Sequence, residues 1–264
     1  MPANRDTLRR YIADLPVGAL PRSMAEEGEV VNAINVDQLP TGLVTGSNLI
    51  QFSPAVSAPI KSSVTLSLLA AQRVASNDPV VLDPDQWVAR HNTVLQNLNW
   101  HNDGGGKVES EFKSVNVAVH QAIIPFLTAA LGGAVAAGSL IVTALEQLQK
   151  IDQDSPWITL FDKQSRRFDV TEYQFTVVEM DEPNRLVRLS MAAARLNADY
   201  GRTQVLFFKL TKEKARFEQV SQKFSADIDL LADMNGDLKA RLSALTKSFI
   251  RGLPDELLLG TGQP

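Results

Sequence analysis

The sequence predicts an α+β fold in which an antiparallel meander sheet packs against helices on one of its faces. It further predicts a central apolar Gly/Ala-rich helix and an extended N-terminal arm. Three observations support this. Residues 114–145 contain no Asp, Glu, Lys or Arg, residues 168–224 follow the two-residue period of strands, and residues 225–249 return to the helical period. The connections within 168–224 are too short for crossover helices, so the strands should be antiparallel.

The N-terminal region is predicted to be an arm without regular structure beyond one short helix. Asp6 can cap that helix, and Pro16 ends it. Residues 30–60 carry a single charge, Asp37, yet their prolines and glycines argue against strands or helices. A segment this apolar should lie across a surface, either of its own domain or of a neighbouring subunit. Deletion of residues 1–46 is therefore expected to leave a folded domain.

The rest of the chain reads as one domain. A buried helix is predicted over 62–75, and a second begins after Asp83, which is followed by Pro84 and, three residues after the cap, by Gln86. Strands are predicted at 107–119, 168–180, 186–198, 204–211 and 215–224, and a long helix follows to Gly252. The predicted units are the arm at 1–60, a single α+β domain at 61–254 and a tail at 255–264.

The uncharged segment can be interpreted in two ways. Pro125 and several glycines lower its helix propensity, so burial in the core would have to compensate. Small residues recur at four-residue spacing at Ala130, Ala134 and Gly138, which permits close packing in a soluble core or in a membrane. A buried central helix is the first interpretation. Under the second, the segment enters a bilayer, and the candidate membrane residues are Ile123, Phe126, Leu131, Gly133, Gly138 and Ile141.

Composition excludes several chemistries. The chain contains no cysteine, which rules out disulfides, thiolate nucleophiles and iron–sulfur clusters. The net charge of -4 and the absence of a basic run argue against nucleic acid as a ligand. The three histidines lack metal-ligand spacing, and the GGGK at 104–107 lacks the P-loop pattern. No catalytic residue, metal, cofactor or small-molecule ligand is predicted.

Three functional hypotheses follow. The first is a non-enzymatic structural subunit that self-assembles into a homo-oligomer or larger assembly through its N-terminal arm, with itself as partner. The alternative is a membrane-active protein, similar in action to pore-forming toxins, that inserts residues 122–145. The third is an enzyme whose site is not visible in sequence. The N-terminus lacks the apolar region of a secretory signal, so a cytoplasmic product is expected, with release by a non-Sec route left open. The candidate assembly interface comprises Leu8, Tyr11, Ile12, Leu15, Val44, Leu49, Ile50 and Phe52.

Overall fold

The structure is a computed structural model, and it describes residues 5–19, 34–112, 118–131, 136–146, 155–168, 170–196 and 215–253. Within these ranges the helices are α1 (Arg5–Ala13), α3 (Ala58–Asn77), α4 (Pro84–Asn97), α5 (Val119–Leu131), α6 (Ala136–Glu146), α7 (Pro156–Gln164) and α8 (Ile228–Phe249). The strands are β1 (Gly42–Thr45), β2 (Asn48–Phe52), β3 (His101–Phe112), β4 (Arg166–Arg167), β5 (Val170–Asp181), β6 (Leu186–Leu196), β7 (Ala215–Asp227) and β8 (Ile250–Gly252).

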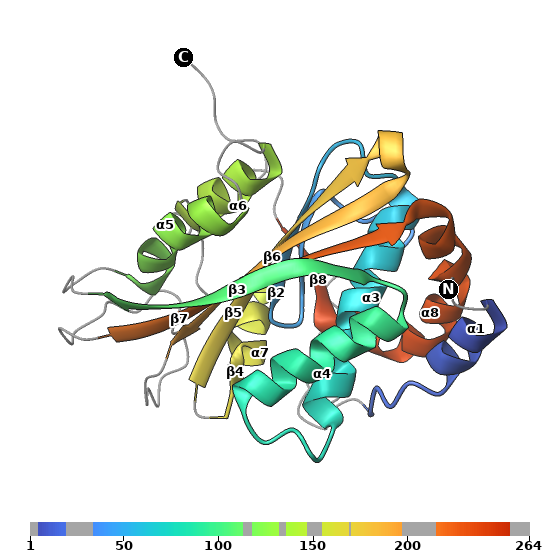
Figure 1. The fold of residues 1–264 in the computed structure, drawn as a ribbon, viewed down its shortest axis with the longest axis horizontal. Coiled ribbons are helices and arrows are strands. Elements are labelled where there is room, and N and C mark those ends of the chain that lie inside the picture. The colour runs from blue at the N-terminus through green and yellow to red at the C-terminus, as the bar shows by residue number, and fades with distance from the viewer. Residues whose placement is uncertain are drawn as a thin grey trace.

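These strands form one mixed, mostly antiparallel sheet, so the α+β fold class is confirmed (Figure 1). The strand order is β3-β7-β6-β5-β2-β1-β8, and β4 pairs with β5 beside this path. The ladders β5–β6, β6–β7 and β3–β7 are long and antiparallel. The β5–β6 pairing agrees with the predicted meander, whereas β6 pairs directly with β7 and not with the strand predicted at 204–211. The exception is β2, which pairs with β5 in parallel. The strand predicted at 204–211 lies outside the described residues.

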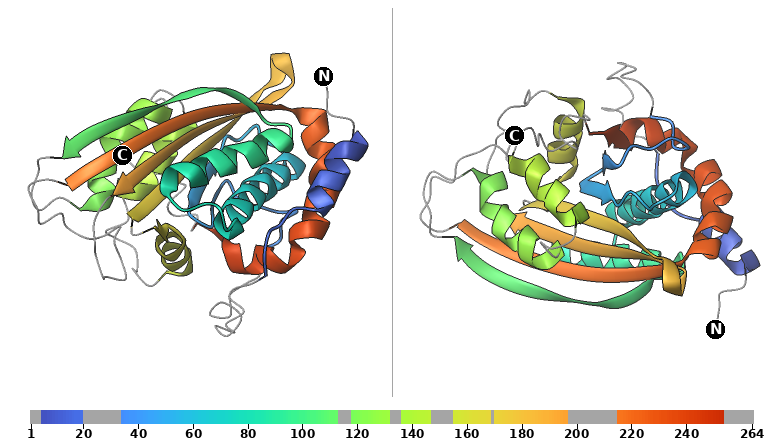
Figure 2. Two further views of the ribbon diagram at one scale, coloured as in Figure 1. Left: turned by 60° about the horizontal axis from the view of Figure 1, so that its bottom comes forward. Right: turned by 90° about the horizontal axis from the view of Figure 1, so that it is seen from above.

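Helices cover both faces of the sheet, so the prediction of one covered face is wrong. One hydrophobic cluster joins the sheet to α1, α3, α4 and α8, and a second joins its other face to α5, α6 and α7. The left view of Figure 2 shows α3 and α4 in front of the strands and α5 and α6 behind them. Successive side chains of β5 point to opposite faces of the sheet and so contribute to both clusters. Phe175 and Val177 belong to the second cluster, whereas Val178 belongs to the first.

The predicted irregular arm contains two strands of the sheet, which lie between β5 and the edge strand β8. β1 and β2 form a hairpin with a two-residue turn at Gly46-Ser47, since Thr45 pairs with Asn48. Gly46 has a φ of 56°, which suits glycine at this turn. Every residue of both strands is buried, because helices cover both faces here. A strand buried on both faces shows no alternation of polar and apolar residues, so the sequence pattern did not indicate these two strands.

The helices on the first face agree with the sequence prediction. α3 is apolar around most of its circumference and is buried from Ser62 to Ala75. α4 begins where expected, because Asp83 Oδ1 accepts a hydrogen bond from the Gln86 amide at 2.8 Å. The side chain of Gln86 reaches one residue further back than a standard capping box, and its Oε1 accepts from the Leu82 amide at 2.8 Å.

The uncharged segment does not form one buried central helix. Its described parts form two helices, α5 and α6, in the layer outside the sheet. Only one side of α5 is buried, whereas Pro125, Thr128 and Ala129 are exposed.

Candidate functional site

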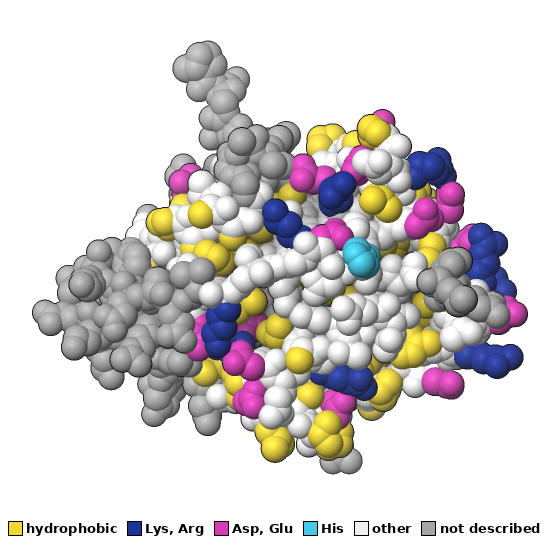
Figure 3. Space-filling model, viewed as in Figure 1, with side chains coloured by type: hydrophobic (Ala, Val, Ile, Leu, Met, Phe, Trp, Pro, Cys, Tyr) yellow, Lys and Arg dark blue, Asp and Glu magenta, His cyan; other side chains and the backbone are white. Residues whose placement is uncertain are grey.

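The α5–α6 pair is the candidate functional site, because it is an outer helical layer whose only charged residue is Glu146, at the end of α6. Its inner side packs on the sheet through buried apolar residues, which include Ile123, Leu127, Ile141 and Leu145. On the outer side of α5, Pro125, Thr128 and Ala129 are exposed, and Phe126 is half-buried. In Figure 3 this region shows mainly hydrophobic and uncharged side chains. Outer helices in water normally carry charges on the exposed side.

A comparison within the molecule shows how unusual this surface is. α8 also covers the sheet, and its exposed or half-exposed side carries Asp229, Asp233, Lys239, Arg241 and Lys247. α5 is also amphipathic, but none of its 13 residues is Asp, Glu, Lys or Arg. Burial against the sheet explains the inner side of α5. It does not explain an outer side without charge.

The sheet surface beneath the helix pair is apolar. It is formed by Tyr173, Phe175 and Val177 of β5 together with Ala192, Ala194 and Leu196 of β6. At its edge, the Tyr173 hydroxyl donates to the buried Asp162 carboxylate of α7 at 2.5 Å. Burial, reinforced by the charge of Asp162, raises the pKa of Tyr173 well above its usual range, so the phenol is neutral and stays a donor. Separation of the helix pair from the sheet would expose this surface.

Of the six residues predicted to enter a membrane, three face the sheet. Ile123 is 2% exposed, Leu131 4% and Ile141 0%. Phe126 is half-buried and Gly138 belongs to α6, while Gly133 lies outside the described residues. Of the residues on the outer side of α5, the sequence prediction therefore included Phe126 but not the exposed Thr128 and Ala129. The sequence could have shown which side of α5 faces water only if the side that the sheet covers had been known.

The residues predicted to form an assembly interface lie in the chain's own core. Leu8, Ile12 and Leu15 are at most 4% exposed, and Val44, Leu49, Ile50 and Phe52 are 0% exposed. Tyr11 is half-buried against the same cluster. Val44 and Leu49 belong to the cluster that includes α5, α6 and α7, and the others belong to the cluster that includes α3 and α8, so the apolar character of the arm is explained within one chain. Assembly through them would require the core to open.

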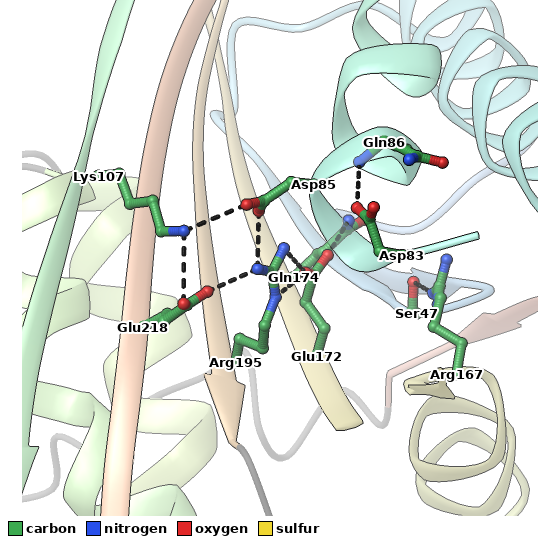
Figure 4. A network of polar contacts seen from close by, with 10 residues as sticks. All are labelled: Ser47, Asp83, Asp85, Gln86, Lys107, Arg167, Glu172, Gln174, Arg195 and Glu218. Carbon is green, nitrogen blue, oxygen red and sulfur yellow. Dashed lines mark hydrogen bonds and ion pairs between the residues drawn. The ribbon is translucent and has the colours of Figure 1, made fainter. Parts of the chain in front are cut away.

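A second feature, missed in the sequence, is a network of charged side chains on the other face of the sheet (Figure 4). Strand register places Glu172, Arg195 and Glu218 side by side on β5, β6 and β7. Arg195 Nε donates to Glu172 Oε2 at 3.0 Å, and its Nη1 donates to Glu218 Oε2 at 2.5 Å. Arg195 is 4% exposed and Glu172 2%. This is a buried ion triad that crosses three strands.

The network also ties α4 to the sheet. Asp85, at the start of α4, accepts from Arg195 at 2.8 Å and pairs with Lys107 of β3 at 3.3 Å. Hydrogen bonding to Arg195 lowers the pKa of Asp85 despite partial burial. Burial alone would lower the pKa of Arg195, but Glu172 and the other carboxylates outweigh it and raise it. Because these three carboxylates are held by cations, none is placed as a free proton donor or acceptor, and the network is structural.

A stack of side chains lies beside this network. Arg167 lies 4.0 Å above the Trp87 ring, and the ring of His91 stacks with Trp87 at 5.1 Å. Burial lowers the pKa of Arg167 to about 10, with the nearby Arg195 adding to the effect and Glu172 opposing it. Trp87, His91 and Gln174 line a small cavity of about 20 Å³ between α4 and the sheet, enough for one water molecule.

The burial of His91 predicts that the stability of the protein depends on pH. Burial lowers the pKa of His91 to about 4, and Arg167 contributes in the same direction. The unfolded chain therefore binds this proton more tightly between about pH 6.5 and pH 4, so stability falls as the pH falls through that window. We expect His91→Phe to remove about 3 kcal/mol of the pH-dependent loss in urea unfolding. His101→Gln, at an exposed histidine, is the control, and parallel pH curves for His91→Phe and wild type would contradict the assignment.

No group of three or more metal-ligating side chains gathers among the described residues. None of the helices in the described ranges is long and apolar enough to cross a membrane. The fold and this surface thus define an α+β protein whose sheet is covered on both faces, on one of them by a helical layer in which α5 carries no Asp, Glu, Lys or Arg.

Comparisons with known proteins give weak structural similarities. No protein-family model and no curated protein matches the chain. Among solved structures, the activated Cyt2Ba monomer from Bacillus thuringiensis subsp. israelensis is similar with a TM-score of 0.36 and 14% identity, over 69% of this chain and 96% of that one. A delta-endotoxin is similar with a TM-score of 0.34 and 12% identity, over 74% and 84%. The Evf virulence factor is similar with a TM-score of 0.30 and 12% identity, over 88% and 92%. Similarities at this level do not carry a function over to this chain.

Proposed function

We propose that the protein is a non-enzymatic, membrane-active protein whose α5–α6 layer leaves the sheet and enters a lipid bilayer. The observation that carries this proposal is the uncharged exposed side of α5. Water favours charged side chains on such a surface, whereas a bilayer penalises each of them by about 2.5–3.5 kcal/mol at its centre. A helix whose inner side is apolar and whose outer side is uncharged meets the requirements of both the folded protein and the lipid.

The lengths of the helices suggest how they meet the membrane. α5 has 13 residues and α6 has 11, whereas a single spanning helix needs about 20. Neither helix alone reaches across the hydrocarbon core in this conformation. The pair would first lie in the interface with Ile123, Leu127 and Ile141 turned from the sheet toward acyl chains. Deeper insertion of residues 122–145 would need a longer helix than the folded state contains.

The energetics of release also favour an apolar destination. In water, separation of the pair would expose its inner side and the sheet surface around Phe175 together, at about 25 cal/mol for each Å² of apolar area. Lipid contact removes the part of this cost that belongs to the helices. The folded state should therefore keep the layer closed in solution and open it only at a membrane.

An exposed charge on α5 tests this proposal. We expect Ala129→Glu to fold normally, because Ala129 is exposed, but to reduce dye release from phosphatidylcholine vesicles by about tenfold or more. The matched control is Ala240→Glu, at an exposed alanine of α8, which should release dye as the wild type does. Absence of dye release by the folded wild-type protein, or equal release by both variants, would refute the proposal.

A further inference from the structure

The loop between α3 and α4 carries the most exposed large apolar side chains of the described residues. Val80 and Leu82 are each 73% exposed, compared with 37% for Phe168, the next in rank. The loop forms the lowest point of the molecule in Figure 1, and hydrophobic side chains gather at that edge in Figure 3. It also contains Pro79 and Val81. The tip is therefore convex and apolar.

The backbone amides of this tip are already hydrogen-bonded inside the loop. Val80 N donates to Asp78 Oδ1 at 3.2 Å and Val81 N donates to Asp78 O at 3.1 Å. Leu82 N donates to Gln86 Oε1 at 2.8 Å, and Pro79 has no amide hydrogen. A strand of a partner protein would need free amides for pairing, whereas a hydrocarbon environment requires that none be left free. The tip therefore meets the requirement of a hydrocarbon environment and not that of strand pairing.

The acidic residues around the tip are also engaged. Asp78 pairs with Arg90 at 2.8 Å. Asp83 caps α4, and Asp85 is held by Arg195 and Lys107. A carboxylate in such a pair is less repelled by a lipid surface than a free one, because its charge is compensated locally. The loop thus presents apolar side chains beside two carboxylates that are paired with cations, Asp78 and Asp85, and one that caps a helix, Asp83.

Both ends of the loop are fixed to the core, so the tip is held in one shape. Trp87 is 1% exposed, and its Nε1 donates to Ser76 Oγ at 3.0 Å, which ties the start of α4 to the end of α3. The guanidinium of Arg167 covers the same indole ring. A preformed tip loses little conformational entropy when it binds a surface.

We propose that residues 79–82 are a lipid-contact site that inserts Val80 and Leu82 into the boundary between headgroups and acyl chains. This inference rests on the proposed membrane activity but uses a different surface. The loop belongs to the helices on one face of the sheet, and α5–α6 covers the other. Contact through the loop and release of the helix pair are therefore separable steps, with the loop binding while the fold is still closed.

A fluorophore on the loop tests the site directly, because the chain has no native cysteine. Leu82→Cys is labelled with an environment-sensitive dye and mixed with phosphatidylcholine vesicles. We expect a blue shift and higher intensity at this position. The same dye at Ala240→Cys on α8, which is also exposed, should keep its aqueous spectrum. Wild-type co-sedimentation with the vesicles is measured in parallel.

A second variant removes the apolar tip without a label. Val80→Ser with Leu82→Ser should keep the circular dichroism and melting of the wild type, because both side chains are exposed, and should bind vesicles at least about tenfold more weakly. Co-sedimentation of the wild type with an aqueous dye spectrum at position 82, or with unchanged affinity of the double variant, would overturn the loop site and leave the membrane activity intact. No co-sedimentation at all would overturn both.

Discussion

Deletion of residues 1–46 is expected to abolish cooperative folding. The deletion removes α1 and β1, and with them buried side chains that include Leu8, Ile12, Leu43 and Val44. Each such loss costs about 2–5 kcal/mol, so the sum exceeds the margin of about 5–15 kcal/mol of a typical domain. β2 and β8 would also lose their shared neighbour in the sheet. Near-ultraviolet circular dichroism and thermal melting measure the result.

A shorter deletion distinguishes the contribution of β1 to stability from that of α1. Removal of residues 1–19 eliminates α1 but keeps β1, so a cooperative transition at a lower melting temperature is expected. The fragment 47–264 would contradict this account if it melted cooperatively with near-native circular dichroism. That outcome is the one the sequence alone predicted, because the arm showed no periodic face.

The sequence was informative where structure is determined locally. The cap at Asp83, the stripe of α8 and the alternation in β5 and β6 each follow from the chemistry of a few neighbouring residues, and all are confirmed. The sequence did not predict the hairpin β1–β2, because its strands are buried on both faces and therefore show no alternation of polar and apolar residues. The hairpin signal at Gly46 was present but was outweighed by the nearby prolines.

The features that sequence analysis missed depend on contacts between distant segments. The triad of Glu172, Arg195 and Glu218 exists only because two ladder registers align these residues, and no local pattern specifies a register. The alternation of Glu172, Gln174 and Thr176 did show that one side of β5 is polar. In the same way, the absence of charge in residues 114–145 was visible, but which side of α5 faces water required the sheet that covers the other.

Replacement of Arg195 by Met is expected to destabilise the protein by about 3–5 kcal/mol, because it leaves the buried carboxylate of Glu172 without its cation. Gln174 Nε2 would remain as a donor to Glu172 at 3.1 Å, which is insufficient to compensate for a lost charge. Asp85 would keep only Lys107, so α4 should also become less firmly attached to the sheet. Urea unfolding at neutral pH gives the free energy of unfolding, and hydrogen exchange in α4 reports the local effect.

Two further variants show whether burial of charge is the cause. Arg195→Met combined with Glu172→Gln removes the unpaired charge and should recover a large part of the loss, because a neutral pair is cheaper to bury than a single ion. Arg185→Met breaks the pair with Asp229, in which both side chains are more than 60% exposed (63% and 64%), and should have only a small effect. If Arg195→Met were as mild as Arg185→Met, or if the double variant were less stable than the single one, the triad would not be a buried ion cluster that fixes α4. A large loss of stability in Arg195→Met, with recovery in the double variant, would show that the charge of Arg195 stabilises this face of the sheet.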